Sequence, residues 1–208
     1  MKKLTFYFLI SLFFITRVLA DQLFVSDIKL GTKLTDYFST AQISKYNIND
    51  NPSDSPFYSY DGKYSIFRIK KESNLYKDNY DWVDITYTNK NDEIVGIGAV
   101  TDLNFNNIDG MNQCVKFRNQ KVSEYKKKNI LIGFTADTVK KIHPDQVRED
   151  SVWFSDILKR IEIGFVCFDY FESVIVNPEK KYDTDFRIDH LTYDFNEWLQ
   201  EQFKKLSN

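Results

Sequence analysis

Histidine is the side chain best suited to acid–base chemistry near neutral pH, and this chain has only two, His143 and His190. His143 precedes Pro144, and a residue before proline favours an extended or turn conformation, so we expect it on an exposed loop. His190 follows Asp189 inside a segment that alternates like a strand. Because adjacent strand residues point to opposite faces, Asp189 should not orient His190 as in a catalytic triad. We therefore predict an ordinary surface or half-buried histidine at position 190.

Carboxylates are the second candidates for catalysis. The local hydrolase motifs Gly-x-Ser-x-Gly, Ser-x-x-Lys and His-Glu-x-x-His are absent from the sequence. Catalytic groups can still converge from distant positions, and a hydrolase would need two carboxylates in one pocket, one of them with a raised pKa. The candidates are five acidic residues of the C-terminal part of the chain: Asp169, Glu172, Asp183, Asp185 and Asp189. The sequence does not choose among them.

One polar cluster has the spacing of calcium ligands. Asp102, Asn104 and Asn106 match the first three ligand positions of an EF-hand loop. However, Asn107 stands where that loop needs glycine, and Gln113 replaces the bidentate glutamate. A second acidic cluster consists of Asp183, Asp185 and Asp189. Charged side chains exposed to solvent explain this cluster equally well. We predict no metal site.

Nucleotide cofactors have no support in the glycine pattern. Gly96 and Gly98 form a Gly-x-Gly that is too short for a dinucleotide fingerprint and does not open a helix, and the P-loop pattern is absent. Two glycines in an apolar strand more simply allow close packing across a sheet. We predict no cofactor.

The two cysteines, Cys114 and Cys167, fall on predicted core-facing positions of a helix and a strand. In an oxidising compartment such a pair is more often a structural disulfide than a reactive one. A redox pair would usually show Cys-x-x-Cys spacing, and structural zinc requires four Cys or His ligands. We predict the disulfide Cys114–Cys167; two separate buried thiols are the alternative.

A polar segment from Asn47 to Gly62 is the most suggestive candidate for binding. It contains three aromatic residues, Phe57, Tyr58 and Tyr60, in a stretch longer than most structureless loops. Aromatic side chains on such a loop could stack on a sugar or anchor a peptide. Alternatively, they fold back and cover the sheet. We predict a partner-binding loop that carries these three residues.

The spacing of apolar residues predicts the elements that position these groups. Helices are expected at 32–41, capped by Thr32, at 110–128, and from Asp194 onward as N-cap. Strands are expected at 63–70, 81–88, 93–101, 151–154, 160–170 and 185–193. The segment 129–147 is ambiguous: residues 129–135 could form a short strand, and residues 137–142 could form a helical turn. The prediction is an α+β fold with a mainly antiparallel sheet and helices packed against it, in the order helix-βββ-helix-βββ-helix.

Residues 1–20 read as a signal peptide. Lys2 and Lys3 precede an apolar run of 13 residues, and Ala20 ends a pattern of small residues typical of a cleavage site. The run spans roughly 20 Å as a helix, less than a bilayer core, although an uncleaved anchor is the alternative. We expect cleavage after Ala20 and no later membrane span. Residues 21–208 then form one α+β domain, and the repeated order of its elements suggests two similar halves, 21–105 and 106–208.

Charge excludes one class of partner. The chain has 28 basic and 30 acidic residues; loss of the three basic residues among the first 20 leaves 25 against 30, a net charge of −5. This argues against nucleic-acid binding. We expect an exported bacterial envelope protein, periplasmic or secreted, that acts as a non-catalytic binding or assembly module for an envelope protein or peptide. The alternatives are a periplasmic hydrolase with dispersed carboxylates and a small-ligand carrier.

Overall fold

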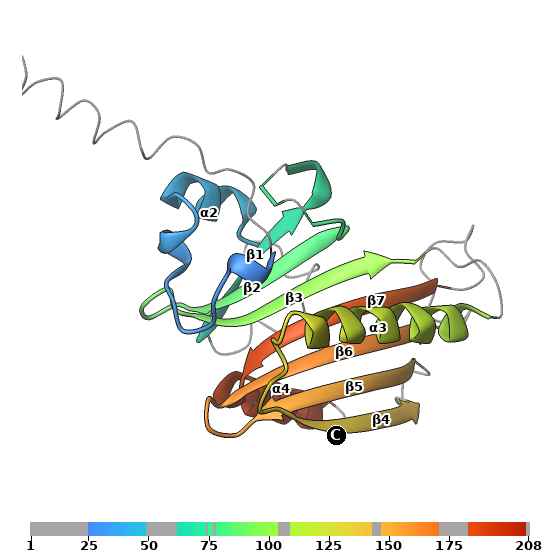
Figure 1. Cartoon of the computed structure of the whole chain (residues 1–208). Helices are drawn as coiled ribbons and strands as arrows, with labels where there is room; N and C mark the ends of the chain where they lie inside the picture. The colour runs from blue at the N-terminus through green and yellow to red at the C-terminus, as the bar shows by residue number, and fades with distance from the viewer. Residues whose placement is uncertain are drawn as a thin grey trace, which may run out of the picture.

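One curved antiparallel sheet organises the chain (Figure 1). The structure is a computed structural model and describes residues 25–48, 62–73, 75–76, 78–103, 109–142, 147–170 and 183–206. Its elements in chain order are η1 (Val25–Asp27), η2 (Leu34–Asp36), α2 (Thr40–Tyr46), β1 (Tyr64–Lys70), η4 (Lys71–Ser73), β2 (Trp82–Thr88), β3 (Ile94–Asp102), α3 (Gly110–Lys127), β4 (Thr135–Ile142), β5 (Arg148–Asp156), β6 (Ile161–Tyr170), β7 (Asp183–Thr192) and α4 (Tyr193–Leu206). The predicted α+β class with an antiparallel sheet is confirmed.

The strand order is β1-β2-β3-β7-β6-β5-β4, and every neighbouring pair is antiparallel. The chain leaves β3 through α3, reaches the far edge at β4, and returns strand by strand until β7 pairs with β3. The two groups of strands therefore form one sheet, joined through β3 and β7. The similarity of the two halves stays a prediction.

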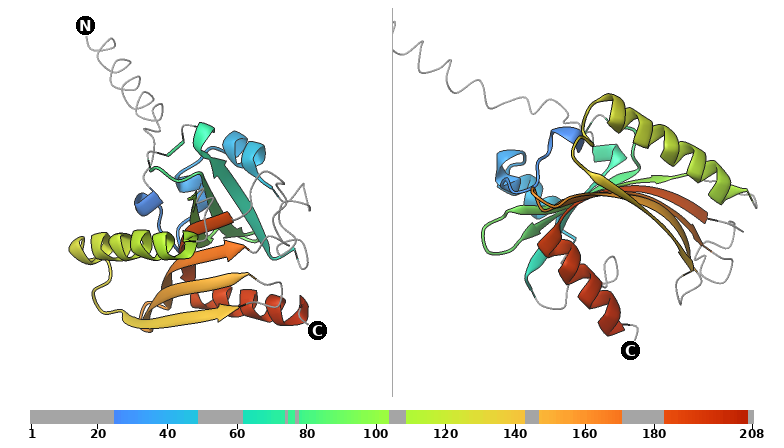
Figure 2. Two further views of the ribbon diagram at one scale, coloured as in Figure 1. Left: turned by 90° about the vertical axis from the view of Figure 1, so that its right-hand side faces the viewer. Right: turned by 60° about the horizontal axis from the view of Figure 1, so that its bottom comes forward.

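The helices cover different faces of the sheet. Figure 2 shows the sheet as an arch, with α3 over its convex face and α4 against part of its concave face. On the convex face, η1, η2 and α2 pack over β1–β3, and α3 packs over β6 and β7. On the concave face, Phe195 and Trp198 of α4 pack against Tyr64, Val95 and Leu191. Both faces of the central strands are therefore buried where these helices lie.

The disulfide Cys114–Cys167 is present and ties α3 to β6. The two Cα atoms are 5.9 Å apart, and both residues are completely buried among the apolar side chains between α3 and the sheet. The prediction is confirmed, and the disulfide closes a loop of 53 residues.

Two predicted helix starts are wrong. The first helix begins at Thr40, because Ser39 accepts a hydrogen bond from the Gln42 amide (3.3 Å) and donates its own amide to the Gln42 side chain (2.8 Å), forming a capping box. Residues Leu34–Asp36 form only a 3-10 turn. The last helix begins at Tyr193 rather than after an Asp194 cap, and Thr192 Oγ1 accepts from the Phe195 amide (3.4 Å).

The expected order is also wrong in its second group of strands, which has four members instead of three. The segment Thr135–Ile142 is the strand β4, where the sequence suggested a helical turn. All of its residues except Val139 are exposed, so no alternation of apolar and polar residues marks the strand. Its pairing with β5 determines its conformation instead.

Candidate functional site

Most of the predicted binding loop lies outside the described residues. Phe57, Tyr58 and Tyr60 lie outside the described residues. The described residues that border this segment are Ile48, after α2, and Gly62, before β1. The role of the three aromatic residues therefore stays a prediction.

The five candidate carboxylates do not meet in one described pocket. Glu172 lies outside the described residues, as does the side chain of Asp183. Asp169 opposes Arg148 on the convex side of the sheet and accepts a hydrogen bond from Thr184 (3.3 Å). Asp189 lies on the concave side and contacts Arg187.

Of the two histidines, His190 lies within the described residues. His143 lies outside the described residues. The ring of His190 points to the convex face, where its Nε2 lies 3.3 Å from the hydroxyl of Tyr125 on α3. Asp189 points to the concave face, so the two side chains are separated by the sheet, as alternation along a strand predicts. The half-buried histidine predicted at position 190 is what the structure contains.

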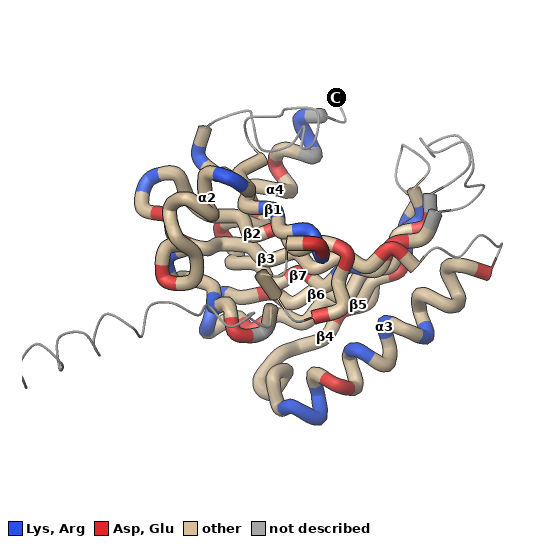
Figure 3. The backbone as a smooth tube through the Cα atoms, turned by 90° about the horizontal axis from the view of Figure 1, so that it is seen from above, with Lys and Arg blue, Asp and Glu red and all other residues tan. Residues whose placement is uncertain are grey.

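A row of seven residues crosses the concave face in register, one from each strand. In sheet order it consists of Arg68, Asp84, Gly98, Asp189, Gly164, Trp153 and Asp137. We call it the transverse row. It begins with a bidentate ion pair, in which Arg68 donates to both carboxylate oxygens of Asp84 at 2.6 and 2.8 Å. Figure 3 shows that basic (blue) and acidic (red) positions both occur along the sheet.

Asp189 occupies the middle of the transverse row between two glycines. It is 6% exposed and accepts a hydrogen bond from Arg187 Nε at 2.5 Å. Burial raises the pKa of the Asp189 carboxyl above its usual value, and the Arg187 guanidinium opposes that shift. A Cβ on Gly98 would lie 2.7 Å from Arg187 Nη2, so this glycine leaves room for the arginine that pairs with Asp189.

Gly164 makes room for an aromatic ring on the other side of Asp189. A Cβ there would lie 2.6 Å from the Trp153 ring, which is held by a hydrogen bond from Nε1 to Ser151 Oγ (3.1 Å). We expect Gly164→Ala to lower the free energy of unfolding by about 2 kcal/mol, because the ring must shift from a packed position. Urea unfolding measures this loss. In a Trp153→Leu background the same change should cost much less; an equal cost in both backgrounds would contradict the argument.

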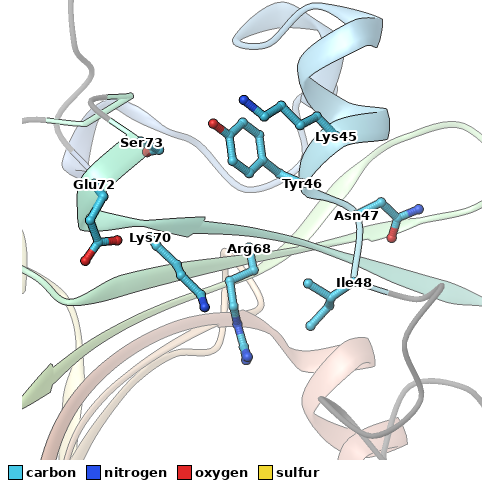
Figure 4. A pocket seen from close by; sticks show the side chains of 8 residues that line it. All are labelled: Lys45, Tyr46, Asn47, Ile48, Arg68, Lys70, Glu72 and Ser73. Carbon is cyan, nitrogen blue, oxygen red and sulfur yellow. The ribbon is translucent and has the colours of Figure 1, made fainter.

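A pocket of about 460 Å³ lies beside β1 at one edge of the sheet (Figure 4). We call it the β1 pocket, and it is lined by Lys45, Tyr46, Asn47, Ile48, Arg68, Lys70, Glu72 and Ser73. Lys45 and Tyr46 come from the last turn of α2, while Arg68 and Lys70 point to the same side of β1. Three basic side chains and one acidic side chain line it, and Arg68 is paired with Asp84, so the remaining charge of the lining is positive.

The β1 pocket opens where the preceding chain leaves the strand edge. Asn47 forms a single bridge with Phe67, and the Ile48 amide donates to the Ile66 carbonyl at 3.1 Å. Before Asn47 the chain is helical, and the Tyr46 ring packs edge-on against Phe67. The strand continues past this contact to Lys70, and the pocket lies along that continuation.

A second pocket, of about 340 Å³, lies at the opposite edge beside β4 and β5. Two carboxylates, Glu149 and Asp150, line it. They are adjacent on β5 and so point to opposite faces, and each has a lysine of β4 at 3.1 Å, Lys141 for Glu149 and Lys140 for Asp150. Two carboxylates that are each paired with a lysine and point to opposite faces do not form an acid–base pair.

Sequence reasoning missed Arg68, Asp84 and Lys70. Arg68 and Asp84 interrupt the apolar positions of two consecutive strands with opposite charges, and such residues often face each other across a hairpin. That signal could have identified their ion pair. The position of the pocket depends on where α2 ends. The predicted bounds of this helix, 32–41, were wrong.

Two further properties limit the chemistry of the described residues. They contain no group of three or more His, Cys, Asp or Glu side chains arranged to hold a metal ion. None of their helices combines the length and apolarity needed to cross a bilayer.

The chain matches no protein-family model, no curated protein and no solved structure.

Proposed function

We propose that this chain is an exported, non-catalytic binding module that holds an acidic, extended segment of another envelope polypeptide in the β1 pocket. The observation that carries the proposal is the position of a predominantly basic pocket along the edge of a sheet. An added peptide strand is a common way for sheet edges to bind a partner.

The charges of the β1 pocket favour an acidic segment. Arg68 is neutralised by its ion pair with Asp84, so Lys45 and Lys70 supply the positive charge that a ligand would meet. Both lysines are exposed, and Glu72 is the acidic residue that lines the same pocket. A carboxylate-rich peptide would place negative side chains near both ammonium groups. Complementary charge of this kind raises the association rate and selects the partner.

The aromatic loop fits the same proposal. The segment with Phe57, Tyr58 and Tyr60 follows directly after Ile48, which lines the β1 pocket. In the proposal, these three residues add apolar contacts to a peptide that the pocket holds by charge. Replacing all three with alanine should then weaken the same ligand.

Export is part of the proposal. The disulfide Cys114–Cys167 is compatible with an oxidising compartment, and no described helix can cross a membrane. We propose that residues 1–20 are a signal peptide cleaved after Ala20, and that the protein resides in the periplasm or is secreted.

Fluorescence anisotropy with labelled peptides tests the binding site. A glutamate-rich decapeptide should bind the protein, and a lysine-rich decapeptide of equal length should not. Lys45→Glu combined with Lys70→Glu should weaken binding at least about tenfold, because both ammonium groups are reversed. Lys116→Glu combined with Lys127→Glu is the control, since these exposed lysines of α3 give the same change in net charge away from the pocket. Equal affinity for both peptides, or an equal loss in the control, would refute the assignment.

The hydrolase and the small-ligand carrier are less well supported. A hydrolase would use Asp189, whose raised pKa suits a general acid. Asp189 is buried, paired with Arg187, and lines neither of the pockets described above. A carrier would need an apolar cavity, whereas charged residues line both of those pockets.

A further inference from the structure

The outermost strand β4 presents a long open edge. Among the described strands it is hydrogen-bonded to β5 alone, and every residue of it except Val139 is exposed. Eight residues span roughly 27 Å of strand. Of the described helices, α3 packs over β6 and β7, and α4 packs against β7, so neither has β4 as its main contact. An exposed edge of this length can pair with another strand.

Two contacts indicate which backbone groups of β4 point outward. The Thr138 amide donates to the side chain of Asp137 at 2.8 Å, which directs this amide away from β5. Thr135 Oγ1 donates to the Ser155 carbonyl, so that carbonyl points from β5 toward β4. Because the direction alternates along an antiparallel strand, the even-numbered residues present their amide and carbonyl groups to the open edge. These residues are Ala136, Thr138, Lys140 and Ile142.

The side chains of β4 are complementary to a second, antiparallel copy of β4. When Val139 lies opposite Val139 of the other copy, Asp137 lies opposite Lys141, and the symmetry of the pair makes this contact twice. In the same register Ala136 opposes the exposed Ile142, and the outward backbone groups of the two strands face each other. About eight new backbone hydrogen bonds can form between these groups.

Neighbouring registers lose this complementarity. A shift of two residues in one direction places Lys140 opposite Lys140, which is repulsive. A shift of two residues in the other direction places Asp137 opposite Val139, so both charge pairs are lost. Charged side chains on an edge strand discourage unspecific pairing. Here Asp137, Lys140 and Lys141 also favour one register over its neighbours.

We propose that two copies of this chain pair antiparallel through β4 about a two-fold axis at Val139, so that two seven-stranded sheets become one sheet of fourteen strands. On pairing, the Thr138 amide donates to the partner strand, and the Asp137 side chain becomes available for Lys141 of the other copy. Lys141 keeps its contact with Glu149, because an ammonium group has three donors. This surface lies at the opposite edge of the sheet from the β1 pocket and does not depend on it.

Disulfide cross-linking of the full chain tests the register. Val139→Cys places two cysteines directly opposite at a non-hydrogen-bonded position, where Cα atoms are about 4.5 Å apart and a disulfide can form. In an oxidising glutathione buffer we expect a covalent dimer on a non-reducing gel. Thr135→Cys is the matched control, because position 135 lies far from its own counterpart in this register. Cross-linking of Val139→Cys no faster than that of Thr135→Cys would overturn the proposal.

Sedimentation velocity of the unmodified protein provides the second measurement. We expect a concentration-dependent dimer in the micromolar range. Asp137→Lys should weaken it at least about tenfold, because both symmetry-related contacts then place lysine opposite Lys141. Asp137 is exposed, so this change should leave the circular dichroism spectrum intact. A protein that stays monomeric at all concentrations, or a dimer indifferent to Asp137→Lys, would contradict the interface.

Discussion

Replacing Cys114 and Cys167 together with alanine should lower the free energy of unfolding by about 4 kcal/mol. The disulfide closes a loop of 53 residues, and the entropy lost by the unfolded chain through that closure gives this magnitude. Both sulfur atoms also lie in the apolar layer between α3 and the sheet, so their removal leaves a small void. A loss of this size is a large fraction of the stability of most domains.

Urea unfolding of the oxidised wild type and of the double variant measures the effect. The wild type reduced under the same conditions serves as the control, and it should lose a similar amount of stability without any change of sequence. A loss below about 1 kcal/mol would show that α3 is held on the sheet by packing alone and that the cross-link contributes little.

Acid should destabilise the protein through His190. Burial between α3 and the sheet lowers the pKa of His190 to about 4, and its Nε2 lies 3.3 Å from the Tyr125 hydroxyl. The unfolded chain takes up a proton near pH 6.5, whereas the folded protein does not until about pH 4. The unfolded state therefore binds more protons across this window, and stability falls as the pH falls. The loss reaches about 3 kcal/mol at pH 4, an upper value because part of the residue contacts solvent.

Urea unfolding at several pH values between 7 and 4 tests this dependence in the wild type and in His190→Gln. Glutamine keeps a polar group near Tyr125 but does not titrate, so the variant should lose most of the slope. Asp189 provides a control of opposite sign. Its raised pKa means that the folded state holds a proton more tightly, which favours folding as the pH falls. Asp189→Asn should therefore steepen the acid loss; the same slope in His190→Gln as in the wild type would exclude His190 as its source.

The sequence predicted those elements whose apolar residues repeat with a clear period. β2 shows why: Val83, Ile85 and Tyr87 alternate with polar residues, and all three are buried. The predicted disulfide also followed from two cysteines at core-facing positions. By contrast, β4 has a single half-buried residue, Val139, and carries no periodic signal. Its conformation depends on β5, a partner that a local window does not contain.

The candidate site was less predictable than the fold, because it depends on strand order. Asp189 lies between Gly98 and Gly164 only because β7 inserts between β3 and β6. Nothing in the spacing of these three residues along the chain indicates that they are neighbours. The β1 pocket similarly depends on the position of α2, which begins after the capping box of Ser39 and Gln42 and ends at Tyr46.

The central position of β7 has a consequence for how the protein folds. β7 is the last of the described strands along the sequence, yet β3 and β6 both pair with it. Pairs such as Gly98 and Asp189 join residues about ninety positions apart, and contacts of such long range slow folding. Until β7 is available, β3 and β6 each lack the strand that pairs with one of their edges. We expect such unpaired edges to make a partly synthesised chain prone to aggregation until its C-terminal segment arrives.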